Sequence, residues 1–246
     1  MHKTLVGVSL SLAAGAFLST GGIALRLIED ADGYQILFYR ALTLIVCMSV
    51  YLVMRHRARL WDVTVAIGPP GLIIAFALGM GATLYVQAIL HTSVANTVVI
   101  LSTSPLLTAF LSWMVLGERA SRSTVAAALV ALAGVGIMVV DGLDTGGLLG
   151  MGIALGAAVS FAVMLVVMQR HQNRDMLPAT GLSGVVTMLV AFVASENLGI
   201  SPHDLGVSIF LGSVQFGLGF ALITLAARFI DGALVALLTL SEVVLA

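Results

Sequence analysis

The segment Tyr85–Glu118, YVQAILHTSVANTVVILSTSPLLTAFLSWMVLGE, decides the fold class of this chain. It contains no lysine, arginine, aspartate or glutamate before its last residue, and only the polar turn Thr92-Ser93 and Pro105 interrupt it. Apolar runs of about 20 residues are long enough to cross the hydrocarbon core of a bilayer, which is about 30 Å thick. The segment therefore predicts the end of one membrane-spanning helix and a second helix that proline breaks.

The rest of the chain has the same character. Charged residues make up 9% of the 246 residues and hydrophobic residues 60%, with a mean hydropathy of +1.12, whereas soluble domains carry about 25% charged residues. A backbone in lipid must satisfy its own hydrogen bonds, and the runs lack the alternation of barrel strands, so we expect an all-α polytopic helical bundle. The expected spans are 4–25, 34–54, 66–90, 93–116, 123–140, 148–168, 178–198, 204–227 and 232–246.

Several classes of function are disfavoured. A net charge of −1 lacks the basic stripe that nucleic acid requires, and the single cysteine, Cys47, cannot form an intrachain disulfide. There is no His-Glu-x-x-His zinc motif and no phosphate-binding Gly-x-x-x-x-Gly-Lys loop, so neither a metal nor another cofactor is expected. The first run is longer than the apolar core of a signal peptide, and we interpret it as a retained span.

The basic residues predict the orientation, because cytoplasmic loops are enriched in lysine and arginine. We expect the protein to lie in the inner (plasma) membrane with its N-terminus in the cytoplasm. In this orientation Arg26 is the one basic residue in an outer connection, and Arg40 lies within a span. The cytoplasmic set is Lys3, Arg55, Arg57, Arg59, Arg119, Arg122, Arg170, Arg174 and Arg228. The outer connections are acidic, with Glu29, Asp30, Asp32, Asp141, Asp144, Glu196 and Asp204.

An internal repeat appears when the chain is shifted by 138 residues. Gly79-Met80-Gly81 then falls on Gly217-Leu218-Gly219, Ser93-Val94-Ala95 on Asp231-Gly232-Ala233, and Ser104 on Glu242. Small residues at four-residue spacing, which allow close packing of helices in lipid, also recur near the start of each half. They are Gly7, Ser11, Gly15 and Ser19 in the first half, and Gly152, Gly156 and Ser160 in the second.

The repeat unit contains five spans, so the second copy is expected to be inverted relative to the first. Inverted repeats are typical of secondary transporters, which bind substrate near the midplane where the repeats meet. We assign 1–140 to the first repeat and 148–246 to the second, and expect ten helices in total. The last run reaches only about 22 Å at 1.5 Å per residue. We therefore expect the chain to be cut inside its ninth helix, with the tenth missing.

The segment quoted above resembles the signature of the EamA repeat in the drug/metabolite transporter superfamily. Thr92, Ser93 and Ala95 match the turn of the signature, and Pro105 matches its helix break. Gly117-Glu118-Arg119 matches the Gly-Glu-Arg sequence that closes it before the next helix. The run 131–136 matches the fifth helix, and Arg40, after Phe38-Tyr39, matches an arginine common at that place. The resemblance covers essentially the whole chain. It implies a ten-helix carrier with both termini in the cytoplasm that exports or exchanges small metabolites such as amino acids.

The chain departs from the family pattern at both broken helices. Many members carry glutamate directly before proline in helices four and nine, whereas here helix four has Ser104-Pro105 and helix nine has Glu242-Val243. A carboxylate within a span is costly, so Glu242 is a candidate for proton coupling or for binding a substrate amine. A structural hydrogen bond is the alternative. Arg40 either attracts a substrate carboxylate or snorkels to the interface.

Helix four carries a polar arc whose members either line a cavity or form hydrogen bonds between helices. Pro105 removes a backbone hydrogen bond within it, and broken helices offer unpaired backbone groups to ligands. The arc comprises Asn96, Thr97, Thr103, Ser104 and Thr108. Further cavity candidates are Tyr85, Gln87 and Gln215, since polar side chains in a core need a partner or water.

We therefore expect a secondary carrier of small molecules embedded in the lipid bilayer, acting in efflux by alternating access at a central cavity; a homodimer is left open. Two alternatives belong to other classes, an intramembrane enzyme and a non-transport membrane scaffold. Gly181-Leu182-Ser183-Gly184 resembles the serine motif of rhomboid proteases, but no later span contains the histidine base that such a serine needs. A scaffold would not require a polar centre at the midplane.

Overall fold

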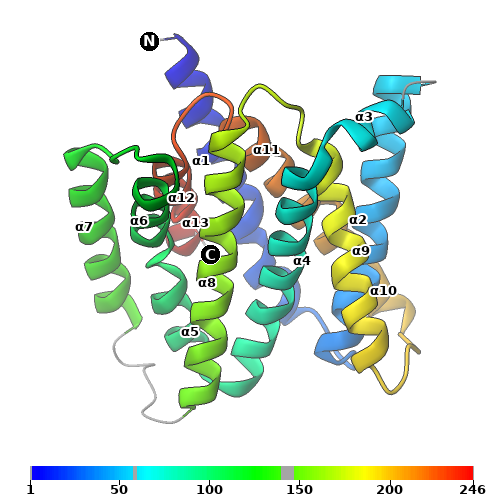
Figure 1. The fold of residues 1–246 in the computed structure, drawn as a ribbon. Helices are drawn as coiled ribbons and strands as arrows, with labels where there is room; N and C mark the ends of the chain where they lie inside the picture. Colours follow the sequence, from blue (N-terminus) through cyan, green and yellow to red (C-terminus); the bar gives the residue numbers. More distant parts are fainter. Residues whose placement is uncertain (1, 58–59, 140–146, 246) are drawn as a thin grey trace.

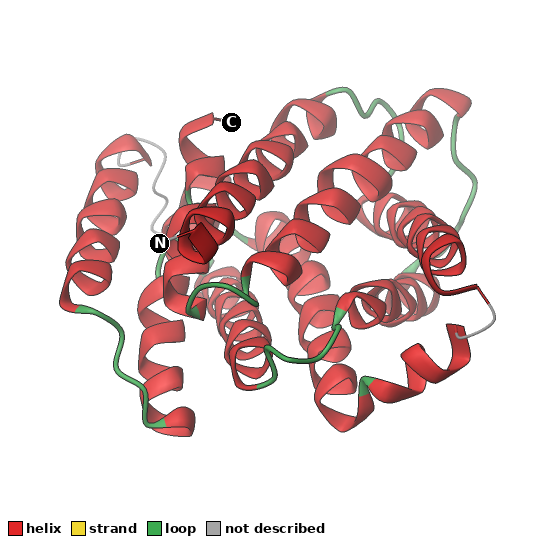
Figure 2. Cartoon of the chain, turned by 90° about the horizontal axis from the view of Figure 1, so that it is seen from above, coloured by secondary structure: helices red, strands yellow, loops and turns green. Residues whose placement is uncertain are grey.

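The computed structural model describes residues 2–57, 60–139 and 147–245, and every element within those ranges is helical. The helices form one bundle, drawn from the side in Figure 1 and along its axis in Figure 2. The all-α polytopic architecture expected from the sequence is confirmed. Arg59, Asp141 and Asp144 lie outside the described residues.

The first half of the chain runs up and down the bundle as far as residue 139. Its first elements are α1 (His2–Arg26), α2 (Gly33–His56), the short α3 (Leu60–Ala66) and α4 (Gly68–His91). A broken helix follows, made of α5 (Val94–Leu101) and α6 (Ser104–Leu116), and then α7 (Arg122–Val139).

The second half begins with α8 (Leu148–Arg170) and α9 (Leu177–Ala194). A long helix then consists of α10 (Pro202–Phe210), the π-helix η3 (Leu211–Leu218) and α11 (Gly219–Ala226), and the broken pair α12 (Gly232–Thr239) and α13 (Ser241–Leu245) follows it. Seven helical segments of the described chain are long and apolar enough to cross a membrane, while 122–137 and 232–245 form shorter apolar helices.

Local sequence accounts for the few boundaries that differ from expectation. The third span begins at Gly68 rather than residue 66, because α3 occupies the preceding connection and Gly68 turns the chain with φ of 59°. Glycine reaches that left-handed conformation without the steric cost of a side chain. Helix α9 ends at Ala194, before the expected 198, since residues 195–201 form a hydrogen-bonded connection.

The two broken helices follow one pattern at the predicted offset. Each boundary of α5 lies 138 residues before the same boundary of α12. Ser93 Oγ accepts the N–H of Asn96 at 3.1 Å to cap α5, and Asp231 Oδ1 accepts the N–H of Leu234 at 2.8 Å to cap α12. The two pairs run in opposite directions through the bundle (Figure 1). Equivalent caps and breaks in opposite directions are what an inverted repeat requires.

Small residues bring the helices close together. A Cβ on Gly79 of α4 would lie 2.7 Å from the carbonyl oxygen of Ser183 in α9. On α1, a Cβ at Gly7 would lie 2.8 Å from the side chain of Ile230, and one at Gly15 would overlap Ser241 Oγ. These contacts show that the small-residue stripe of α1 packs against the end of the second half.

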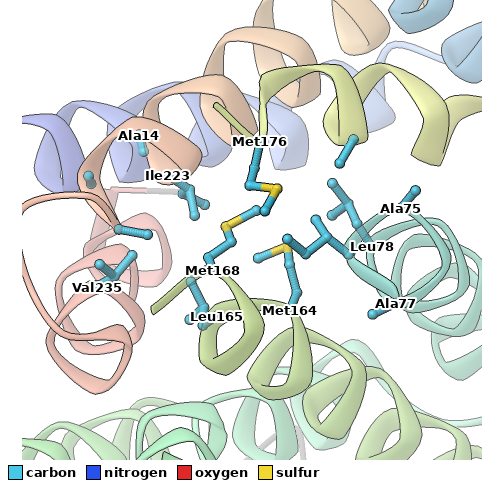
Figure 3. Close-up of a cluster of buried hydrophobic side chains, with 14 of the residues drawn as sticks. Ala14, Ala75, Ala77, Leu78, Met164, Leu165, Met168, Met176, Ile223 and Val235 are labelled. Atoms are coloured by element: carbon cyan, nitrogen blue, oxygen red, sulfur yellow. The ribbon is translucent and has the colours of Figure 1, made fainter. Parts of the chain in front are cut away.

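Methionines fill the core between α4, α8, α11 and α12. Met164, Met168 and Met176 are each at most 3% exposed and pack with Leu78 and Ile223 (Figure 3). Methionine is unbranched and adapts to irregular gaps, so this core can repack more readily than one of branched side chains.

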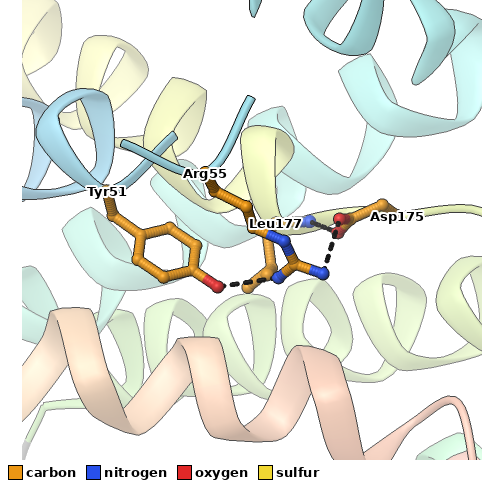
Figure 4. A network of polar contacts seen from close by, with 4 residues as sticks. All are labelled: Tyr51, Arg55, Asp175 and Leu177. Carbon is orange, nitrogen blue, oxygen red and sulfur yellow. Dashed lines mark hydrogen bonds and ion pairs between the residues drawn. The ribbon is translucent and has the colours of Figure 1, made fainter. Parts of the chain in front are cut away.

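The end of the bundle that carries the N-terminus, called the N-terminal end below, holds a small polar network (Figure 4). Arg55 donates to the hydroxyl of Tyr51 at 2.7 Å and lies 4.0 Å from the carboxylate of Asp175, which accepts the N–H of Leu177 at 3.1 Å. Such exposed ion pairs add little stability. The network instead holds the end of α2 beside the connection between α8 and α9.

Candidate functional site

The side chain of Arg40 points into the bundle and is 7% exposed. Helix α2 begins with a capping box, in which Asp32 accepts the N–H of Gln35 at 2.8 Å and Gln35 accepts that of Asp32 at 2.8 Å. The guanidinium of Arg40 lies 4.9 Å from the centre of the Phe216 ring, within cation–π range. Within the described residues it has no hydrogen-bond acceptor and no ion-pair partner. The guanidinium is therefore buried against an aromatic ring and is not exposed at the surface of the bundle.

Tyr85 interacts electrostatically with both Arg40 and Glu242. The phenol of Tyr85, on α4, lies within electrostatic reach of Arg40 on α2 and of Glu242 on α13. The structure thus gathers a cation, a phenol and a carboxylate from three helices far apart in the sequence. A buried charge is expensive unless it is paired, so this cluster is a candidate site for a polar ligand.

The π-helix η3 forms one wall of the cluster. A Cβ on Gly212 would overlap the carbonyl oxygen of Arg40, so glycine is required for η3 to approach α2 this closely. Short π-helical segments occur frequently at functional sites. Phe216 contacts Arg40, and the neighbouring Gln215 donates weakly to the carbonyl of Leu18 at 3.4 Å while its Oε1 is buried without a partner.

Two further polar atoms near the broken helices have no partner among the described residues. Ser241 Oγ, at the first residue of α13, is buried and unpaired, as is Nε2 of Gln87 on α4. Buried polar groups are usually hydrogen-bonded, so these two atoms are candidates for contact with a polar ligand.

The hydroxyls of the polar arc bond to their own helix. Thr97 donates to the carbonyl of Ser93 at 3.1 Å, Thr103 to Ile100 at 2.6 Å and Thr108 to Ser104 at 2.7 Å. Asn96 lies at the other end of the arc, where it donates to Thr92 Oγ1 at 2.9 Å. The arc is therefore spread along the helix and is not gathered around Arg40.

The break at Pro105 is compensated locally. Proline has no N–H to offer the carbonyl of Leu101, and the hydroxyl of Ser104 donates to that oxygen instead. Ser104 and Pro105 are both buried, so the break lies inside the bundle.

Sequence reasoning missed several residues that the structure places in polar positions. The sequence did not single out Phe216 or Ser241, and it placed Asp204 only among the acidic residues of the outer connections. Gln169 lies at the end of α8 and bonds to three different segments. Its position between an apolar run and Arg170 was the one available signal.

No group of three or more histidine, cysteine, aspartate or glutamate side chains is placed to hold a metal ion in the part of the chain that is described. An apolar groove of about 680 Å³ lies between α1 and α10, lined by residues such as Ile23, Leu27 and Phe210. A polar crevice of about 60 Å³ lies beside Gln169.

Comparison with known proteins places this architecture in a family. Residues 5–140 match the model of the EamA-like transporter family. A curated relative, the uncharacterized transporter YwfM of Bacillus subtilis (strain 168), is 29% identical over an alignment of 143 residues that covers 53% of this chain. The alignment spans 47% of that relative, about half its length.

A protein of known crystal structure shares the fold over 99% of this chain and 85% of its own, with a TM-score of 0.77 and 20% identity. The family match covers more than half of the chain and includes the turn, the break and the close from which the resemblance was recognised. The chain therefore belongs to the EamA-like transporter family.

Proposed function

We propose that the protein is a secondary transporter that moves small metabolites, amino acids or similar compounds, across the inner membrane by alternating access. The observation that supports it best is the buried guanidinium of Arg40, which has no acceptor among the described residues. Arginine presents a planar fork that matches a carboxylate. A substrate carboxylate would supply the missing counter-charge.

Glu242 and Tyr85 extend the same proposal. A ligand held by Arg40 would bring its second polar group toward Tyr85 and Glu242, which lie within electrostatic reach of each other. Glu242 would bind a substrate amine or exchange a proton during transport. Gln215, with its unpaired Oε1, would add a hydrogen-bond acceptor at the edge of the site.

The mechanism follows from the two halves of the chain. We assign residues 1–140 and 148–246 to the two repeats, which rock about the cluster and expose it to one side of the membrane at a time. The basic N-terminal end would face the cytoplasm, as the enrichment of lysine and arginine there favours, and the direction of transport would be efflux.

A comparison of intracellular and extracellular metabolites tests the proposal. Cells that express the protein should deplete one class of compound inside and enrich it outside, relative to cells with an empty vector. Arg40→Gln should reduce the transport rate of the carboxylated compound more than that of an analogue without the carboxylate. Equal loss for both analogues would assign Arg40 a structural role, and an unchanged profile with the protein in the membrane would contradict efflux.

A further inference from the structure

The side chain of Gln169 joins three segments at the N-terminal end of the bundle. Its Oε1 accepts the hydroxyl of Ser112 at 3.2 Å and the backbone N–H of Gly232 at 2.9 Å. Its Nε2 donates to the carboxylate of Glu118 at 2.7 Å. Gln169 lies in the last turn of α8, Glu118 follows α6, and Gly232 begins α12, so one amide holds both halves of the chain together.

The geometry leaves little freedom in how this amide is placed. A Cβ on Gly232 would lie 3.2 Å from Oε1 of Gln169 and 3.1 Å from the methyl group of Thr108, so the approach is as close as glycine permits. The first N–H groups of a helix lack partners within it. The side chain of Asp231 accepts the backbone N–H of Leu234, and the side chain of Gln169 accepts the backbone N–H of Gly232. The oxygen of the amide therefore faces α12, and its nitrogen faces Glu118.

The hydrogen bonds of Gln169 lie at the boundary between a small surface crevice and the packed interior of the bundle. The crevice of about 60 Å³ beside Gln169, lined also by Arg119 and Asp231, has room for about two water molecules. Immediately deeper, Thr108 and Leu165 are completely buried and Met168 is 3% exposed. Packed side chains thus begin directly behind the amide.

We propose that Gln169, Glu118 and Gly232 form a latch that keeps the site around Arg40 and Glu242 closed toward the N-terminal end. The inference rests on the proposed carrier function, because alternating access requires the halves to separate at this end. Glu118 belongs to the first half, and Gln169 and Gly232 to the second. Opening the path breaks the bonds from Gln169 to Glu118 and Ser112 and admits water to Thr108, while the methionines behind it repack.

The test measures how fast a water-soluble maleimide labels a cysteine behind the latch. Thr108→Cys in a Cys47→Ser background supplies the only thiol, and lipid nanodiscs expose both faces to the reagent. In Gln169→Glu, a carboxylate still accepts from Gly232 but now faces the carboxylate of Glu118. We expect labelling to accelerate about tenfold, the effect of losing one charge-assisted hydrogen bond.

Two matched variants separate polarity from simple disruption. In Glu118→Gln the new amide offers an oxygen to Gln169, so labelling should stay within about twofold of the parent. In the double variant Glu118→Gln with Gln169→Glu, donor and acceptor are exchanged and the bond is restored, so labelling should return to within about twofold of the parent. A double variant that labels as fast as Gln169→Glu, or a Gln169→Glu that labels like the parent, would overturn the latch.

If Gln169→Glu does not fold, as judged by gel filtration, the test uses variants of the exposed residue Glu118 instead. Glu118→Ala removes the partner of Nε2 without adding a charge, and labelling should rise about threefold, against no change in Glu118→Gln. Equal labelling in both would reject the proposal. None of these measurements needs a substrate, so failure of the transport assay with the expected labelling would contradict the carrier function and leave the latch standing.

Discussion

Asp204 is expected to be the most important single polar residue for stability at the end of the bundle opposite the N-terminus. Its side chain is completely buried, and its two oxygens accept the backbone N–H groups of Glu29, Asp30 and Ala31, each at 3.0 Å. The α1–α2 connection thus folds around a carboxylate supplied by α10. Replacement by alanine would leave all of these donors without their acceptor.

The magnitude follows from the number of bonds lost. Each donor left unpaired costs about 1 kcal/mol or slightly more, so Asp204→Ala should lower the free energy of unfolding by about 3–4 kcal/mol. For a chain of this size, each kcal/mol shifts Tm by about 2–4 °C, which predicts a decrease of roughly 6–16 °C. Asp204→Asn retains one acceptor oxygen, so its Tm should lie between that of the unmodified protein and that of Asp204→Ala.

The assay is thermal unfolding of the purified protein in one detergent, followed by the loss of monomer on gel filtration. Asp231→Ala is the matched control, because Asp231 caps α12 through a single bond to Leu234 and its loss should cost about 1 kcal/mol. A decrease in Tm for Asp204→Ala no larger than that for Asp231→Ala would refute the reasoning from bond number.

Three further outcomes are expected. Glu242→Gln should abolish the pH dependence of transport, because a permanently neutral side chain cannot exchange protons; a pH–rate profile in proteoliposomes checks this, and an unchanged profile rules out coupling. Gly212→Ala should destabilise the protein by about 1–3 kcal/mol in thermal unfolding, because its Cβ would overlap the carbonyl of Arg40, whereas Gly134→Ala, with nothing within 4 Å, should be neutral or stabilising. Phe216→Leu should weaken substrate affinity about fivefold by removing the ring beneath Arg40, measured as KM; an unchanged KM would show that the ring does not support the guanidinium.

The spans were predictable because each is decided by its own residues. The helices α1, α2, α8 and the pair α5–α6 lie within a few residues of the expected ranges, since apolar length and local caps determine where a membrane helix starts and stops. The short α3, LWDVTVA, was missed because its seven residues are too few to span a membrane, so its apolar residues did not mark it as a helix of its own. The π-helix η3 was missed for a different reason, since its extra residue per turn reflects the contact of Gly212 with α2.

The candidate site was only partly predictable. Arg40, Tyr85 and Glu242 were chosen one by one, because polar groups are rare in such runs, and nothing in the sequence placed them beside one another. The polar arc was expected as a unit, yet its hydroxyls bond along their own helix. Gln169 and Asp204 gave almost no signal, because their roles depend on backbone N–H groups that belong to other segments.

What the sequence by itself determined is local or periodic. It includes the number and length of the apolar runs, the break at Pro105 and the offset of 138 residues, which recurs in the boundaries of α5 and α12. What only the tertiary structure decided is which polar groups meet. Arg40 lies over Phe216 and within reach of Tyr85, and Tyr85 within reach of Glu242, because close packing at small residues turns these side chains toward one interior. Helix rotation and approach depend on contacts between distant segments, and apolar composition alone leaves both undetermined.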